Sequence, residues 1–153
     1  MTLTVDVSAD GVRSPISRER IAEIAKTVLR SERVKNALLS ITLLDRRAMA
    51  RLNTKHLDHV GATDVISFGF TRVTGADPVI GDVYICPDVA RENAKANRTQ
   101  AREEIARLVV HGVLHVLGHD HPVDDGRERS DMWRRQERIL RRAVDAADNG
   151  ARR

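Results

Sequence analysis

Residues 111–121 read HGVLHVLGHDH and hold four of the six histidines of the chain. On an α-helix, His111 and His115 are four positions apart, so they point the same way with Cβ atoms about 5–6 Å apart. Two imidazoles at that separation can bind one zinc ion. Valines and leucines fill most other directions of this helix, which predicts a buried helix whose side chains offer the histidines no hydrogen-bond partner. We therefore predict that these histidines form a metal site rather than being hydrogen-bonded only to backbone carbonyls.

A third ligand is expected just after the helix. Gly118 is a natural left-handed helix end, and the turn there brings either His119 or His121 back toward the pair. The spacing leaves both choices open. Three protein ligands leave a fourth position for water, which is typical of a catalytic zinc site rather than a structural one. Zinc would lower the pKa of such a water and make it a usable nucleophile.

The neighbours of the histidines narrow the chemistry. Gly112 stands where zinc peptidases of the HExxH kind carry their general-base glutamate, which disfavours peptide hydrolysis. Glu104 shares a helix face with His111 but lies about 10 Å along the axis, too far to bind the same ion. We consider it a candidate for orienting substrate or a neighbouring group, or an ordinary helix acid. Asp120 is a candidate for orienting a ligand histidine, or a turn residue. No side chain is assigned as general base, so the catalytic residues stay unknown.

Hydrophobic periodicity predicts the elements that position this site. Strands are expected at 3–7, 37–44 and 83–86, with a further strand after a loop within 60–70. Helices are expected at about 16–31, 46–56, 87–97, 100–117 and 126–146. Asp45 and Thr99 are the expected N-caps of the second and fourth helices, and residues 74–82 are read as turn.

These elements predict strands interleaved with helices, ending in a helical half, with a buried helix that carries the candidate zinc ligands. The length of 153 residues favours one metal-binding hydrolase domain over residues 1–153. Residues 1–148 are expected to be ordered and 149–153 to form a frayed tail.

Composition limits the function classes. The formal net charge of +4 is compatible with a polyanionic partner such as RNA, or with arginines on solvated helix faces. Aromatic residues make up only 3%, which disfavours modules that stack bases on exposed rings. The one cysteine, Cys86, reads as a small buried hydrophobe and calls for no oxidising compartment. We expect no signal peptide and no membrane span, and therefore a cytoplasmic protein.

The histidine segment resembles the motif of the YbeY family of bacterial endoribonucleases and ribosomal RNA maturation factors. That motif reads H-G-x-L-H-x-x-G-[YH]-D-H, and residues 111–121 match it at every fixed position. Further segments in the same order are similar to the family's conserved blocks. They are LNTKHLDHVGATDVISF at 52–68, GDVYICPDVARENA at 81–94, EEIARLVVHG at 103–112 and MWRRQERIL at 132–140.

The resemblance implies an α+β fold similar to that of zincins, in which a small mixed β-sheet packs against a helical layer and a central buried helix carries the zinc ligands. It also implies one zinc ion per chain, held by His111, His115 and His121, with His119 outside the ligand set. It implies a metal-dependent, single-strand-specific endoribonuclease that acts in the maturation of ribosomal RNA, at the 3′ end of the small-subunit RNA, and in ribosome quality control. The implied partners are ribosomal RNA and the ribosomal subunit, with no membrane and no DNA. Oligomeric state stays unknown.

One position departs from the family. Many members carry an arginine after the Leu-Asn pair, where an ungapped alignment places Leu57 of this chain. Arg46, Arg47 and Arg51 are candidates to replace that arginine. Alternatively, they only form the solvated face of their helix. The departure keeps open the alternative of a non-catalytic ribosome-associated factor with a structural zinc site. A metallohydrolase of another substrate class is a further alternative, although Gly112 disfavours peptide hydrolysis. The arginines of the last helix are likewise candidates for phosphate contacts, although interspersed acids favour a solvated face.

Overall fold

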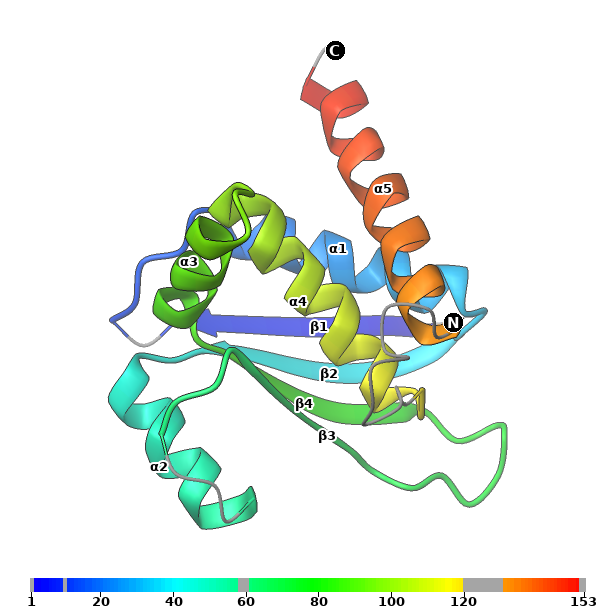
Figure 1. Cartoon of the computed structure of the whole chain (residues 1–153). Helices are drawn as coiled ribbons and strands as arrows, with labels where there is room; N and C mark the ends of the chain where they lie inside the picture. The colour runs from blue at the N-terminus through cyan, green and yellow to red at the C-terminus, as the bar shows by residue number, and fades with distance from the viewer. Residues whose placement is uncertain (1, 10, 58–60, 120–130, 152–153) are drawn as a thin grey trace.

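The computed structural model of the chain describes residues 2–9, 11–57, 61–119 and 131–151. Four strands and five helices occur in these ranges (Figure 1). The strands are β1 Thr2–Ala9, β2 Asn36–Leu43, β3 Val65–Gly69 and β4 Val79–Ile85. The helices are α1 Arg18–Ser31, α2 Arg46–Leu57, α3 Pro87–Ala96, α4 Ala101–Val116 and α5 Asp131–Ala151.

The strands form one mixed sheet in the order β1-β2-β4-β3. β1 pairs with β2 and β2 with β4 in parallel, whereas the short β3 runs antiparallel along β4 and forms an edge. Burial alternates along β2 and β4, as expected for a sheet with one fully covered face. The predicted α+β fold, with a small mixed sheet against a helical layer, is confirmed.

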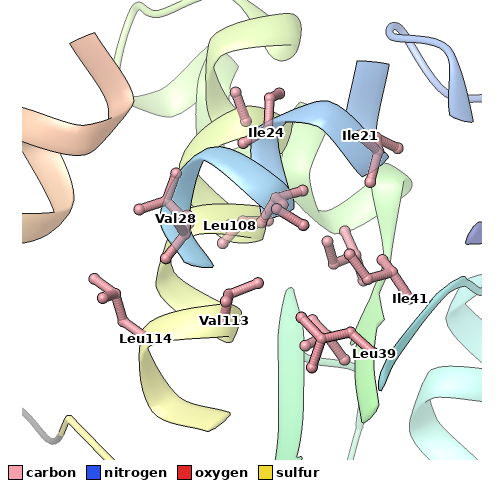
Figure 2. Close-up of a cluster of buried hydrophobic side chains, with 14 of the residues drawn as sticks. Ile21, Ile24, Val28, Leu39, Ile41, Leu108, Val113 and Leu114 are labelled. Atoms are coloured by element: carbon pink, nitrogen blue, oxygen red, sulfur yellow. The ribbon is translucent and has the colours of Figure 1, made fainter. Parts of the chain in front are cut away.

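The main core lies between this face and helices α1 and α4. Figure 2 shows Ile24 and Val28 of α1 and Val113 of α4 meeting above the strands, and each is at most 1% exposed. Leu39 and Ile41 of β2 close the cluster from below. Because most buried positions of α4 are aliphatic and closely packed, this helix is held firmly on the sheet, which fixes the turn that carries the histidines near its end.

Helices α2 and α5 take up different positions. α2 packs on the opposite sheet face, where Met49, Ile66 and Cys86 form a separate small cluster (Figure 1). The predicted burial of Cys86 is confirmed, and burial raises the pKa of its thiol. α5 packs against α4 and α1, and its C-terminal part projects beyond the sheet (Figure 1). Within the described ranges, no helix has the length and apolar character needed to cross a membrane.

Three local predictions need correction. Residues 79–82 belong to β4 rather than to a turn, because pairing with β2 and β3 overrides their glycine and aspartate. Thr99 does not cap α4: its backbone N–H donates to Ala94 O at the end of α3, and Gln100 precedes the first turn of α4. α5 ends at Ala151 rather than near 146, so residues 149–151 of the predicted tail are helical. The Asp45 cap is confirmed by a 2.8 Å bond from the Ala48 N–H.

Candidate metal centre

His111 and His115 lie side by side on the last two turns of α4. Their ring centroids are 4.5 Å apart, and the ring planes cross at 72°. Both side chains are half-buried, on a helix whose neighbouring positions 112–114 are buried. The predicted i, i+4 geometry is therefore confirmed, and the two imidazoles are close enough together for a shared ligand.

The helix ends where the sequence predicted. Gly118 has φ +98°, a left-handed conformation that glycine adopts without steric cost. Its N–H donates to His115 O at 2.9 Å, and the N–H of His119 donates to Leu114 O at 3.0 Å. These two bonds form a Schellman motif, which satisfies the last helix carbonyls and reverses the chain. The turn thus sets the direction in which the segment after α4 departs.

His119 is held by a buried carboxylate at the end of α1. Its Nε2 contacts Oε1 of Glu32, and Arg135 of α5 donates to the other oxygen of that carboxylate at 2.7 Å. The Glu32 side chain is only 10% exposed. One acid therefore links α1, α5 and the chain leaving α4.

The third predicted ligand is not among the described residues. Both His121 and Asp120 lie outside them. Within the described part of the chain, no three His, Cys, Asp or Glu side chains are grouped closely enough to hold a metal ion. The three-histidine set thus stays a prediction, and His119 does not complete it from within the described residues.

A glutamine of α5 contacts the first histidine. Oε1 of Gln136 lies 2.7 Å from Nδ1 of His111, and Gln136 is only 2% exposed. An amide oxygen can only accept, so Nδ1 of His111 is the donor and carries the proton. The lone pair of the imidazole is then on Nε2. A neutral imidazole whose other nitrogen is anchored in this way is the form in which histidine binds zinc, so the residues present fit that metal.

Arg107 connects this contact to the acids of α4. It makes two bonds to the Glu137 carboxylate, at 3.0 and 3.1 Å, and a third to Glu104 at 3.1 Å. Glu104 is 8% exposed, and burial raises its pKa despite the opposing effect of Arg107. Glu104 therefore belongs to a partly buried charge network that reaches Gln136 through Arg107 and Glu137. Its role toward substrate stays a prediction.

We expect Glu104→Gln to gain stability relative to wild type as pH rises from the ordinary pKa of glutamate, about 4.3, through the raised pKa of the folded state. The raised pKa means that the folded state holds the Glu104 proton more tightly than the unfolded chain does. The stability contribution of this group is therefore full at low pH and is lost as pH rises through the folded pKa, and glutamine removes that loss. Urea unfolding at several pH values measures the effect.

Glu103→Gln is the matched control for this measurement. Glu103 contacts the same Arg107, but its side chain is 46% exposed against 10% for Glu104. A pH-dependent gain as large for Glu103→Gln as for Glu104→Gln would contradict the burial argument.

Gly112 allows α4 to approach the sheet. A Cβ at this position would lie 2.6 Å from Cγ1 of Val83 and 3.2 Å from Oγ of Ser67. Two strand glycines accept the same helix one turn later, since a Cβ on Gly69 or Gly81 would collide with Val116. The absence of a glutamate after His111 therefore has a steric cause, because side chains at this position point into the sheet.

Comparison with known proteins extends these observations to the whole chain. Residues 7–144 match the family described as Endoribonuclease YbeY. A protein of that name from Kineococcus radiotolerans is 36% identical over 144 residues, covering 89% of this chain and 82% of the relative. A second protein of that name, from Thermobifida fusca, is 35% identical over 147 residues, which cover 90% of this chain and 92% of the relative. The chain belongs to the YbeY family.

The fold also matches a solved structure. The solution structure of TM1509 from Thermotoga maritima aligns with a TM-score of 0.64 and covers 96% of this chain and 93% of that one. The sequence identity is 18%, so this similarity concerns the fold alone.

The structure separates the family's histidine motif from the arginines considered as substitutes at Leu57. Those arginines are on α2, which packs on the sheet face opposite α4. Arg46 forms an ion pair with Glu92 of α3, whereas Arg47 and Arg51 are exposed. Leu57 is the last residue of α2. The three arginines and the histidine pair therefore lie on helices that pack on opposite faces of the sheet.

Two residues around the YbeY-family motif escaped the sequence analysis. Gln136 and Glu32 hold His111 and His119 from elements far along the chain. A signal for Gln136 existed, because it interrupts the buried stripe of α5 formed by Met132, Ile139 and Ala143. A polar residue on such a stripe requires a buried hydrogen-bond partner. Glu32 had no comparable signal, since an acid at a helix end is ordinarily solvated.

Proposed function

We propose that this YbeY-family protein is a zinc-dependent, single-strand-specific endoribonuclease that acts in ribosomal RNA maturation, at the 3′ end of the small-subunit RNA, and in ribosome quality control. The observation that carries the proposal is the His111–His115 pair with its anchored Nδ1, on a helix of a chain that matches the family over residues 7–144. The relatives' name states an endoribonuclease activity, and we extend that activity to this chain.

In this proposal His111, His115 and His121 hold the zinc ion. When bound, zinc supplies Lewis-acid chemistry, by polarising a phosphoryl oxygen or activating water. The protein orients the two α4 imidazoles on a rigid helix and keeps His111 in its Nδ1–H form. Half-burial of both histidines limits competing water, and the positive net charge of +4 favours binding of a phosphate backbone. Ribosomal RNA and the ribosomal subunit are the proposed partners, and the cytoplasm is the proposed location.

The proposal is tested by measuring metal content and cleavage of single-stranded RNA on the same preparations of wild type, His121→Ala and His119→Ala. His121→Ala is expected to lose both zinc and cleavage, because two imidazoles alone bind zinc weakly. His119→Ala is the matched control two residues away. It is expected to keep zinc, since the His119 side chain is engaged by Glu32.

The outcomes distinguish the alternatives. A metal-replete wild type that cleaves no RNA would overturn the enzyme assignment. If that protein still bound ribosomal RNA, the non-catalytic maturation factor would be favoured instead. Zinc loss in His119→Ala but not in His121→Ala would reverse the choice of third ligand.

A further inference from the structure

The hydrogen-bond chain behind His111 has a defined direction. Oε2 of Glu137 lies 3.0 Å from Nε2 of the Gln136 amide, and a carboxylate oxygen accepts from that nitrogen. The opposite end of the amide, Oε1, must then be the atom that faces Nδ1 of His111 at 2.7 Å. The amide orientation is therefore determined by its two neighbours rather than by either contact alone.

Glu137 is held in its charged form at the far end of this chain. Burial raises its pKa, but the bonds from Arg107 and Gln136 outweigh burial and lower it overall. Arg107 binds both oxygens of the Glu137 carboxylate, which is the bidentate geometry that orients a carboxylate most strongly. The hydrogen bonds thus run from the Arg107 cation through Glu137 and Gln136 to the Nδ1 proton of His111.

We propose that Gln136 is a positioning residue: through the Arg107–Glu137 pair it holds the Nδ1–H tautomer and the ring orientation of His111, so that Nε2 is the metal-binding atom. The metal part of this inference rests on the proposed function. Histidines that bind metals usually donate their other N–H to such a partner, and loss of that partner costs about 10–100-fold in metal affinity or activity.

The position of Gln136 supports this role over that of a filler in the core. It occupies the buried face of α5 between Met132 and Ile139, where a leucine or methionine would pack without any polar requirement. Both of its polar ends have partners, and one of these partners is the first histidine of the motif. α5 therefore contributes a specific hydrogen bond to α4 in addition to apolar contact.

The test compares Gln136→Met, which keeps length and burial but lacks the amide, with Gln136→Glu, which keeps an acceptor oxygen for Nδ1. Gln100→Leu, at an exposed glutamine before α4, is the control. Zinc affinity is measured by competition with a chelator. The tautomer of His111 is read in the metal-free protein from its ¹⁵N chemical shifts.

Gln136→Met is expected to weaken zinc binding about 10–100-fold and to let the Nε2–H tautomer of His111 appear. Gln136→Glu is expected to keep the Nδ1–H tautomer of His111, because its carboxylate can still accept from Nδ1, although it loses the bond to Glu137. Gln100→Leu is expected to stay close to wild type in both readouts. A folded Gln136→Met protein with wild-type zinc affinity and an unchanged tautomer would overturn the proposal. So would an Nε2–H tautomer in the wild type itself, a measurement that needs no variant to fold.

The same data separate this inference from the proposed function. If the wild type binds no zinc, but the Nδ1–H tautomer of His111 is present in wild type and lost in Gln136→Met, the positioning role is supported and the metal site is contradicted. A wild type that binds zinc with equal affinity in all variants supports the metal site and contradicts the positioning role.

Discussion

His115→Ala is expected to abolish RNA cleavage and to weaken zinc binding by more than about 100-fold, beyond the loss typical of an outer partner. The second imidazole of the pair would be gone, and among the described residues no other His, Cys, Asp or Glu side chain is grouped with the pair to replace it. Zinc should raise the thermal midpoint of wild type, because a ligand that binds only the folded state stabilises it. The variant should show no such rise.

His56→Ala is the control for this experiment. His56 is an exposed histidine of α2, on the far side of the sheet from the pair, and its ring contacts Phe68. It should keep both zinc and cleavage. If His115→Ala retained zinc and RNA cleavage at the wild-type level, the pair would not be the metal site, and the proposed mechanism would fall with it.

The second large effect is expected at the glycine between the two histidines. Gly112→Glu would place a Cβ 2.6 Å from Cγ1 of Val83 and a carboxylate at a buried position of α4 that faces the sheet. Overpacking costs about 1–3 kcal/mol, and an unpaired buried charge adds several more. A domain of this size has a free energy of unfolding of about 5–15 kcal/mol. We therefore expect the variant to lose most of this stability, which a denaturant titration would show as a large fall in the unfolding midpoint, and to gain no peptidase activity.

A double-mutant cycle isolates the steric cause. Gly112→Ala should cost about 1–3 kcal/mol in wild type, because the stiff valine of β4 cannot move aside. In a Val83→Ala background the same change should cost nothing, or gain up to about 1 kcal/mol from the better helix propensity of alanine. An equal cost in both backgrounds would show that the approach of α4 to Val83 is not what requires glycine.

The close approach of α4 to the sheet links these two predictions. The buried face of α4 packs on β3 and β4 through Gly112, and this packing sets the distance between the sheet and the last turns of α4, which carry His111 and His115. Gln136 of α5 then fixes the orientation of the His111 ring through its hydrogen bond to Nδ1. A larger residue at 112 would therefore displace the site as well as destabilise the fold.

The sequence by itself determined the features that depend on local geometry. His111 and His115 are one helical turn apart, so their proximity follows from helix periodicity alone. The Gly118 turn and the Asp45 cap are also local, because each is formed within a few residues of chain. The hydrophobic pattern likewise predicted strands interleaved with helices, whereas the mixed sheet and the helical layer were implied by the resemblance to the YbeY family.

The tertiary structure decided what depends on residues far apart in the chain. Residues 79–82 carry turn chemistry, yet pairing with β2 extends them into a strand. Gly112 was read as an absent glutamate, whereas its physical cause is contact with Val83 on another element. Gln136 reaches His111 across 25 positions because α5 packs on α4, and no local pattern encodes that contact. The sequence therefore predicted the histidine pair, and only the packing of α4 against β4 and α5 showed how it is held.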